Sequence, residues 1–388
     1  MNNDSGLLEL ERAAKAPLGP QPLNEDLHLD TPRLADVLDE IDFLVRTFVK
    51  LPNLALAVLL AVWIAGTYTF LNFRYCGYLA LRSATPRCGK TLVMRILSQL
   101  ANGNPPITST PTPAVLFRST RPVLLLDEVD KLRNADKEKY GEVLAVLNCG
   151  FEAGAVVDRC NKQTLKVESF SVYGPKALAG IEGLADTLTD RAFQVQMERS
   201  AQRMPRFNLR KMNDLFVQLR EGMQSWASDH ETKMKDMYDD LPDQLACLEG
   251  FDDRFQDIAE PLIVLATLAD AERPEGPAIL PRLLAGFTAA AGRREPSGRE
   301  KQLLAVLEIA STRLAVAEEV FVRSMDLVAD CAAIEDLAFI ETGRKLAGLL
   351  KHFDLCPTFN HAKTERGYWI TQSWIETWRG RYAKTGEV

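Results

Sequence analysis

The sequence has little that would hold a structural metal or a disulfide framework. Its seven cysteines are scattered without a Cys-x-x-Cys pair, and its four histidines do not have the spacing of metal ligands. An odd number of scattered cysteines is typical of reduced thiols in a cytoplasmic protein. We therefore expect a cytoplasmic chain with no zinc site and no disulfide framework.

Basic residues are not in excess either. The 388 residues include 46 Lys and Arg against 53 Asp and Glu, which gives a net charge of −7. An acidic chain is not a general coat for nucleic acid, so any contact with DNA must be local. The first residues lack a basic segment followed by an apolar core, and no signal peptide is expected.

Long apolar runs are also scarce, and one stretch alone suggests a membrane helix. Residues 54–71 carry no charge and are just long enough to span a bilayer. The stretch contains Gly66 together with threonines and a tyrosine, and it leads directly to a predicted strand. We therefore expect a buried helix against a sheet and no membrane partner.

A Gly-Lys-Thr turn lies between a predicted strand (78–81) and a predicted helix (92–100). This order is the P-loop layout, in which backbone N–H groups surround the phosphates of a nucleotide. Lys90 is expected to reach the β- and γ-phosphates, and the Thr91 hydroxyl is expected to hold Mg²⁺. The loop departs from the usual pattern at Ala84, where the first glycine normally stands. The residues expected to bind ATP are Pro86, Arg87, Cys88, Gly89, Lys90, Thr91 and Leu92.

A second apolar strand ends in two carboxylates. Residues 123–126 are Val-Leu-Leu-Leu, and Asp127 and Glu128 follow them. In a P-loop ATPase such an aspartate holds Mg²⁺ from its second coordination shell, and such a glutamate orients and polarises the attacking water. The alternative is an ordinary α/β domain with a Gly-Lys-Thr turn and an acidic strand end. We favour the nucleotide site because two independent parts occur in the right order and at a workable spacing.

The order of elements predicts an α/β fold with a three-layer P-loop core. Strands alternate with helices through the middle of the chain, which is typical of a parallel sheet covered on both faces. The first residues are polar and acidic and predict a flexible tail. We expect a tail (1–31), a helical N-terminal cap (32–74), an ATPase core (75–204), a helical lid that ends in a proline-containing linker over 272–300 (205–300), and a winged-helix-like C-terminal domain (301–388).

The last segment resembles a winged helix-turn-helix. Helices are predicted near residues 303–311, 320–329 and 342–353, and a hairpin-like stretch spans 356–371. Residues 341–388 contain eight basic and five acidic side chains, a local charge of +3. This suits contact with the DNA backbone, and the alternative is a protein-docking unit whose charges are merely solvated. The candidate DNA-binding residues are Arg344, Lys345, Lys351, Lys363 and Arg366. The residues expected to pack in the core of this domain are Trp369, Trp374 and Trp378.

Several motifs together resemble a known family. They are Pro-Arg-Cys-Gly-Lys-Thr (86–91), Leu-Leu-Asp-Glu-Val-Asp (125–130), Leu-Asn-Cys-Gly (147–150), Pro-Lys-Ala-Leu-Ala-Gly-Ile (175–181), Asp-Thr-Leu-Thr-Asp-Arg (186–191) and Asp-Arg-Phe-Gln-Asp-Ile-Ala-Glu-Pro-Leu (253–262). From about residue 35 to about residue 380 the chain resembles the uncharacterised P-loop ATPase domain, of the broad AAA+ type, that occurs in helicase- and primase-type proteins of prophages, plasmids and genomic islands. The resemblance implies ATP, Mg²⁺ and a ring of identical subunits such as a hexamer.

The resemblance also implies roles for two arginines. In AAA+ rings an arginine at the position of Arg191 reaches into the neighbouring site and stabilises charge on the γ-phosphate. The alternative for Arg191 is a salt bridge with Asp186 or Asp190. Arg254 starts the lid helix, where such proteins often place an arginine that contacts nucleotide, and the alternative is a solvated side chain. Weaker candidates for the nucleotide site are Lys176, Asn148 and Arg159.

These observations support two hypotheses about function. In the first, the chain is a ring ATPase of a mobile genetic element that acts on DNA as a helicase or replication motor, with Glu128, Lys90 and Arg191 as its catalytic residues. In the second, ATP binding drives assembly of a scaffold or switch whose C-terminal unit recruits a protein, as in phage defence or transposition. A small-molecule kinase is set aside because the sequence has no recognisable acceptor site.

Overall fold

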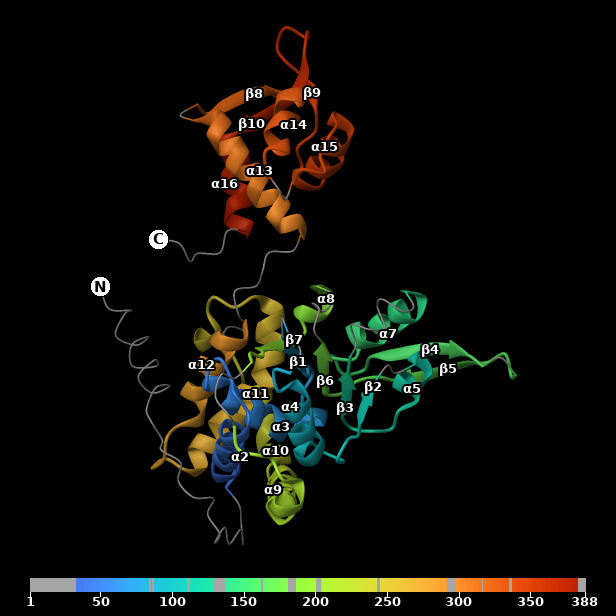
Figure 1. Cartoon of the computed structure of the whole chain (residues 1–388), viewed down its shortest axis with the longest axis vertical. Helices are drawn as coiled ribbons and strands as arrows, with labels where there is room; N and C mark the ends of the chain where they lie inside the picture. Colours follow the sequence, from blue (N-terminus) through green and yellow to red (C-terminus); the bar gives the residue numbers. More distant parts are fainter. Residues whose placement is uncertain are drawn as a thin grey trace. The chain divides into compact units, whose positions relative to one another are not determined.

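The computed structural model describes residues 33–83, 85, 87–109, 112–128, 137–161, 163–180, 186–199, 204–242, 245–291, 298–315, 317–334 and 337–382. The predicted tail, Ala84 and Pro86 lie outside these ranges. The chain divides into two compact units, Met1–Gly292 and Arg293–Val388, and both are drawn in Figure 1.

A parallel sheet forms the centre of the first unit. In the residues described, its five strands lie in the order β2 (Ile107–Ser109), β3 (Leu124–Asp127), β6 (Lys176–Gly180), β1 (Tyr78–Arg82) and β7 (Ala192–Gln196). The central strands are continuous apolar runs because both faces of the sheet are covered, and every residue of β6 is buried. Each neighbouring pair is parallel, so the carboxyl ends of all strands meet at one edge and the amino ends at the other.

Helices cover both faces of this sheet. The crossover from β1 to β2 contains α4 (Lys90–Leu100). The later crossovers contain α5 (Pro113–Arg118), α7 (Lys137–Cys149) and α8 (Asp186–Thr189), and they move across the sheet in the opposite direction. Right-handed crossovers of opposite direction lie on opposite faces. In agreement, α7 contacts both α5 and α8, while α4 packs on β2, β3 and β6. The fold is therefore α/β with a three-layer arrangement, as predicted.

The remaining helices of the first unit pack beside the sheet. They are α2 (Leu34–Phe48), α3 (Ala55–Thr69), η1 (Phe70–Asn72), η2 (Leu209–Met212), α9 (Asn213–Asp229), α10 (Glu231–Asp239), η3 (Ala246–Leu248), α11 (Asp253–Glu272) and α12 (Ile279–Ala291). Helix α3 contacts α2, α11 and α12, and α12 contacts the edge strand β7. The N-terminal cap and the predicted lid are thus in direct contact.

The apolar stretch predicted as a buried helix is α3. By length and composition Ala55–Asn72 could cross a membrane, but 78% of it is buried inside this unit. Its polar side chains are tied to the core, since Trp63 Nε1 donates to Gly77 O at 2.7 Å and Tyr68 donates to Leu100 O at 2.7 Å. These contacts are those of a core helix.

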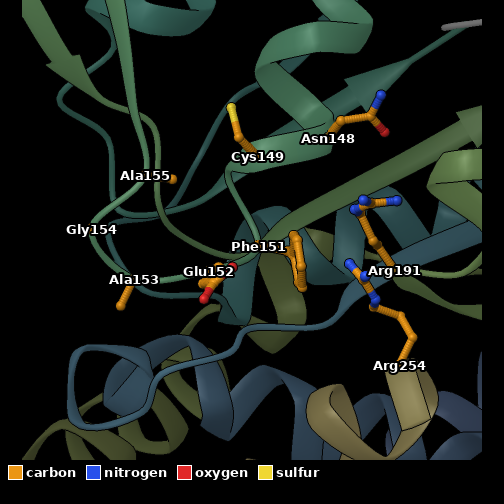
Figure 2. Close-up of a pocket in the computed structure, with 9 residues that line it drawn as sticks. All are labelled: Asn148, Cys149, Phe151, Glu152, Ala153, Gly154, Ala155, Arg191 and Arg254. Atoms are coloured by element: carbon orange, nitrogen blue, oxygen red, sulfur yellow. The ribbon is translucent and has the colours of Figure 1, made fainter.

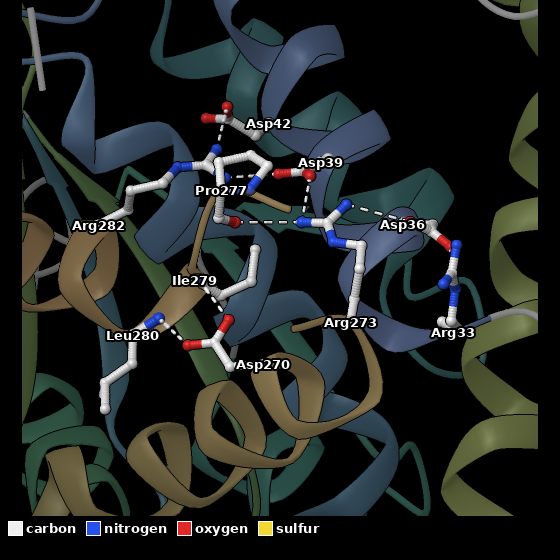
Figure 3. Close-up of polar contacts among 10 residues, drawn as sticks. All are labelled: Arg33, Asp36, Asp39, Asp42, Asp270, Arg273, Pro277, Ile279, Leu280 and Arg282. Atoms are coloured by element: carbon white, nitrogen blue, oxygen red, sulfur yellow. Dashed lines mark hydrogen bonds and ion pairs between the residues drawn. The ribbon is translucent and has the colours of Figure 1, made fainter. Parts of the chain in front are cut away.

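Three aspartates on α2 connect this helix to α11 and α12 (Figure 3). Asp36, Asp39 and Asp42 recur every three residues and therefore share one face of the helix. Arg273 follows α11 and contacts Asp36 at 3.0 Å and Asp39 at 2.6 Å. Arg282 of α12 contacts Asp39 at 2.5 Å and Asp42 at 2.7 Å. Because each arginine bridges two carboxylates, we expect α2, α11 and α12 to move together.

The prediction of a linker over residues 272–300 is wrong for α12. Leu283 and Phe287 of this helix are fully buried. At Gly286 an added Cβ would lie 2.9 Å from Ala55 O of α3, so the lack of a side chain allows the two helices to approach closely. The four prolines of this stretch suggested a break, but Pro281 lies in the first turn of α12, where proline is tolerated.

Strands β4 (Val156–Cys160) and β5 (Val167–Ser171) form a separate antiparallel ribbon. Phe117 of α5 packs against this ribbon. The guanidinium carbons of Arg118 and Arg159 lie 5.9 Å and 5.1 Å from its ring centroid. Both arginines are ion-paired, Arg118 with Glu168 at 3.8 Å and Arg159 with Glu142 at 3.2 Å. Arg159, a weak candidate for the nucleotide site, is thus part of the ribbon.

The second unit combines helices with a small antiparallel sheet. Its elements are α13 (Gly298–Leu314), β8 (Glu319–Arg323), α14 (Ser324–Ala332), α15 (Gly343–Leu350), η5 (Lys351–Phe353), β9 (Thr358–Phe359), β10 (Arg366–Thr371) and α16 (Gln372–Tyr382). Among the described residues, β10 is the middle strand between β8 and β9. The predicted helix at 320–329 is wrong at its start, because Val320 and Val322 pair with Ile370 and Tyr368 across the sheet.

Candidate functional site

The loop between β1 and α4 has an unusual backbone. Arg87 and Gly89 have positive φ angles of 66° and 90°, and Gly89 stands immediately before the first turn of α4. Backbone of this kind turns successive N–H groups toward a common point, where they form a concave site for an anion. The first N–H groups of α4 also lack partners within the helix and carry its positive dipole end. The loop therefore fits a phosphate group at the carboxyl edge of the sheet.

The side chain of Lys90 points back to the end of β1. Its Nζ donates to Ser83 Oγ, and Ser83 in turn donates to Thr85 O at 2.7 Å. Ser83 is only 1% exposed, so this hydroxyl is a fixed acceptor. The arrangement holds the ammonium group at the loop, and nothing in the sequence singled out Ser83 as its partner.

The other residues predicted to bind nucleotide differ in exposure. Arg87 and Thr91 are exposed at the loop and the helix start. Cys88 is buried and its Sγ lies 3.1 Å from Thr85 O. Leu92 packs against the core and its N–H bonds to Gly89 O at 2.9 Å, so it serves the helix start. Pro86 lies outside the described residues.

The two predicted carboxylates follow β3 at the same edge. Glu128 has a φ of 59°, a left-handed conformation that is strained for a residue with a side chain. Its N–H donates to Asp127 Oδ1 at 2.9 Å, which helps to hold this conformation. Strained backbone is found most often at functional sites. It persists only where the surrounding structure holds it in place, and there it can orient a side chain for a task.

The strand order brings the loop and the carboxylates together. Strand β6 lies between β1 and β3, and neighbouring strands are about 4.8 Å apart, so the two strand ends are about 10 Å apart. A triphosphate with its metal can bridge such a span. ATP with Mg²⁺ would fit these residues, because Thr91 and Asp127 carry side-chain oxygens, the ligand type that this ion prefers.

Lys176 is not at this edge. It is the first residue of β6, 2% exposed, and its Nζ donates to Gly150 O at 3.1 Å, to Val172 O at 2.8 Å and to Gly174 O at 2.8 Å. Burial lowers the pKa of this lysine to about 8, which still leaves the ammonium form at neutral pH. Its place at the amino end of β6 makes Lys176 a structural residue and not a phosphate sensor.

Replacing Lys176 should destabilise the first unit strongly. Lys176→Met keeps the length of the side chain but leaves three carbonyl groups without their buried donor, at a cost of about 3 kcal/mol. Thermal unfolding should therefore occur roughly 5–10 °C lower. The exposed Lys166→Met is the matched control, with an expected change below about 0.5 kcal/mol. Equal melting temperatures for the two variants would contradict the structural role.

A pocket of about 440 Å³ lies at the opposite, amino edge of the sheet (Figure 2). Arg191 stands just before β7 and its carbonyl accepts from Tyr78 N, at the start of β1. Arg254 belongs to the first turn of α11, and Asn148 belongs to α7. The structure therefore brings Arg191 and Arg254 together and separates both from the loop of their own chain. The resemblance placed Arg254 at the nucleotide, and here it lies beside Arg191 instead.

Basic residues of the second unit are spread over α15, η5 and the β9–β10 turn. Lys345 is ion-paired with Glu341 at 2.8 Å and donates to Phe339 O at 3.0 Å. The other four predicted DNA-binding residues, which are all exposed, are Arg344, Lys351, Lys363 and Arg366. Within the described part of the chain, no ion pair occupies these four side chains.

The three tryptophans of this unit do not share one environment. Trp378 is buried in the core, and Trp374 packs against it and donates to Phe353 O at 2.8 Å. Trp369 was expected in the core as well, but it lies on the other face of β10. It contacts Phe321 and His361, with ring centroids 5.3 Å and 4.4 Å away. The reason is strand alternation, because the flanking Tyr368 and Ile370 point inward.

No protein-family model and no curated protein matches this sequence. Among solved structures, the A form apo structure of the NrS-1 C terminal region aligns at a TM-score of 0.38 and 10% identity, over 88% of this chain and 76% of that chain. A structure of Drosophila ORC bound to DNA aligns at a TM-score of 0.21 and 14% identity, over 97% of this chain and 99% of that chain. Alignments at these scores carry no argument about function.

Proposed function

We propose that this chain is an ATPase that works as an oligomer of identical copies and acts on DNA. The observation that carries the proposal is the meeting of two features at one edge of the sheet. One is the loop that ends in Gly89 and Lys90, and the other is the pair Asp127 and Glu128, the second of which has strained backbone. An ordinary α/β domain has no need to place a strained carboxylate beside an anion-binding loop.

Each residue at this edge has a defined task in hydrolysis. The N–H groups of the loop and the ammonium of Lys90 bind the phosphates of ATP. Thr91 and Asp127 would hold Mg²⁺, which neutralises charge on the phosphates when it is bound. Glu128 accepts the proton of the attacking water and orients it in line with the γ-phosphate.

Arg191 contributes from a second copy of the chain. It lies at the amino edge of the sheet, whereas the loop follows the carboxyl end of β1. Five residues of β1 separate the two edges, a distance of about 15 Å, which an arginine side chain does not span. An arginine so placed reaches a γ-phosphate only in a neighbouring subunit, so the active form is an oligomer such as a hexameric ring.

The second unit supplies the contact with DNA. Its order of helix, strand, two helices and two strands is that of a winged helix, with α15 as the recognition helix and the β9–β10 turn as the wing. Arg344 lies in α15 and Lys351 directly follows it. Lys363 lies in the β9–β10 turn and Arg366 at the start of β10. Their charges attract the DNA backbone locally, although the chain as a whole is acidic.

A second candidate function is an ATP-gated scaffold that recruits a protein. The outward face of β10 favours it, because the half-buried rings of Trp369 and Phe321 pack together there, and Trp369 Nε1 donates to the backbone carbonyl of Phe359 at 3.3 Å. Partly exposed aromatic side chains are typical of protein interaction surfaces.

Hydrolysis assays separate the two functions. ATP turnover by the purified chain should be measured with no DNA and with single-stranded, duplex and forked DNA, beside its mass in solution with and without ATP. A motor predicts an ATP-dependent oligomer whose turnover DNA stimulates at least several-fold. Slow turnover that DNA leaves unchanged, with assembly that ATP still drives, would support the scaffold instead.

A further inference from the structure

Two guanidinium groups share one phenyl ring in the pocket at the amino edge (Figure 2). The guanidinium carbons of Arg191 and Arg254 lie 5.0 Å and 5.1 Å from the ring centroid of Phe151. The ring is 4% exposed, it stacks on Tyr75 with centroids 5.8 Å apart, and its backbone carbonyl accepts from Cys76 N at 2.7 Å. Phe151 is therefore a fixed platform for two side chains that come from different elements.

The positive charge of this pair is only partly compensated, because Asp190 acts on Arg191 and Asp257 acts on Arg254 without forming an ion pair with that arginine. Among the described residues no carboxylate forms an ion pair with Arg191 or Arg254. Arg191 donates from Nη1 to Thr187 O, and its buried Nε has no hydrogen-bond partner. Burial, together with the positive charge of Arg254, lowers the pKa of Arg191. Two like charges held beside one ring repel each other, so an anion that enters the pocket is favoured by both.

The same chain provides a contrast. Phe117 also carries two arginines over its ring, Arg118 and Arg159, but both of these are paired with glutamates. The arrangement at Phe117 is complete in itself. At Phe151 neither arginine is paired in this way among the described residues. Glu152, which also lines the pocket, pairs with Arg74 at 3.0 Å, and the pocket has room for a phosphate group.

We propose that Phe151 is a positioning residue, which holds Arg191 and Arg254 as a pair that receives the terminal phosphate of ATP bound to a neighbouring copy of the chain. This rests on the proposed function, because it needs hydrolysis between subunits. In this proposal Arg254 acts together with Arg191 across the interface between two copies of the chain, and not on the nucleotide of its own chain. A phosphate of nucleic acid has the same chemistry, and parallel measurements of ATP turnover and of DNA binding distinguish the two sources.

Phe151→Leu removes the aromatic platform and leaves the nucleotide loop, at the other edge of the sheet, unchanged. We expect turnover to fall about 10- to 100-fold because the pair loses its position, with ATP affinity within about twofold of wild type. Phe151→Tyr should restore most of the activity, and Phe117→Leu is the matched control for the loss of a phenyl ring beneath two arginines. If Phe151→Leu folds poorly, Arg254→Gln should give the same loss of turnover with unchanged ATP affinity.

Mixing two variant proteins distinguishes a displaced arginine pair from a misfolded protein. Lys90→Ala protein keeps the arginine pair but lacks the loop lysine, so adding it to Phe151→Leu protein should restore part of the turnover. Turnover of Phe151→Leu equal to that of Phe117→Leu, or no restoration in the mixture, would overturn the proposal. The proposal would also be overturned if Phe151→Leu bound fluorescein-labelled single-stranded DNA more weakly than wild type while its turnover stayed unchanged. That result would assign the pocket to nucleic acid. Absence of hydrolysis by wild-type protein would instead remove the proposed function itself.

Discussion

Lys90→Ala should reduce the affinity for ATP by at least tenfold and by as much as about 100-fold. The substitution removes a charge-assisted hydrogen bond to the phosphates, which is worth roughly 1.5–3 kcal/mol. Equilibrium titration with a fluorescent ATP analogue measures this directly. The exposed Arg95→Ala, on the same helix, is the control and should bind the analogue like wild type.

The titration also addresses the departure at Ala84. The φ angles of Arg87 and Gly89 provide the concave backbone of the loop without a glycine at position 84. Wild-type protein should therefore bind the analogue in the micromolar range, on the order typical of such sites. Equal affinity of Lys90→Ala and wild type would contradict a nucleotide-binding role for this loop.

Arg191→Ala should retain ATP binding and lose turnover by about 10³-fold. An arginine that stabilises charge on the γ-phosphate in the transition state has an effect of this size, and it leaves ground-state binding nearly unchanged. Steady-state turnover and equilibrium binding are measured on the same preparation. The exposed Arg199→Ala, which follows the same strand, should turn over at the wild-type rate.

A mixture of Arg191→Ala and Lys90→Ala proteins tests whether the arginine acts between copies. Each variant lacks one half of the composite site, and adjacent copies of the two kinds rebuild one complete site. Part of the turnover should therefore return on mixing, whereas each variant alone stays inactive. A mixture no more active than its components would place Arg191 outside the neighbouring site.

The sequence was sufficient for the elements with strong local signals. The strand before the loop, α4 and the strand that ends at Asp127 all follow from apolar runs and from glycine. Parallel pairing then brings Lys90 and Glu128 to one edge, because crossovers have a fixed hand. The strained backbone of Glu128 has no signal in the sequence.

Other features depend on contacts between distant segments. Strand β8 forms because β10 pairs with it, and α12 is held by its fit against α3 at Gly286. Phe151 has no signal of its own in the sequence, because the two arginines at its ring come from distant segments, Arg191 just before β7 and Arg254 in α11. Arg254 was placed at the nucleotide by resemblance, and its actual neighbour is visible only in three dimensions.

The most direct test of the central claim is ATP hydrolysis by wild-type protein beside Glu128→Gln in the presence of Mg²⁺. The variant keeps the shape of the side chain and removes the base, which contributes about 10²- to 10⁴-fold to such reactions. We predict measurable turnover by wild type, a loss of at least 100-fold in Glu128→Gln, and equal ATP binding by both. No turnover by wild type, or equal turnover by the two proteins, would contradict an ATPase site at this edge of the sheet.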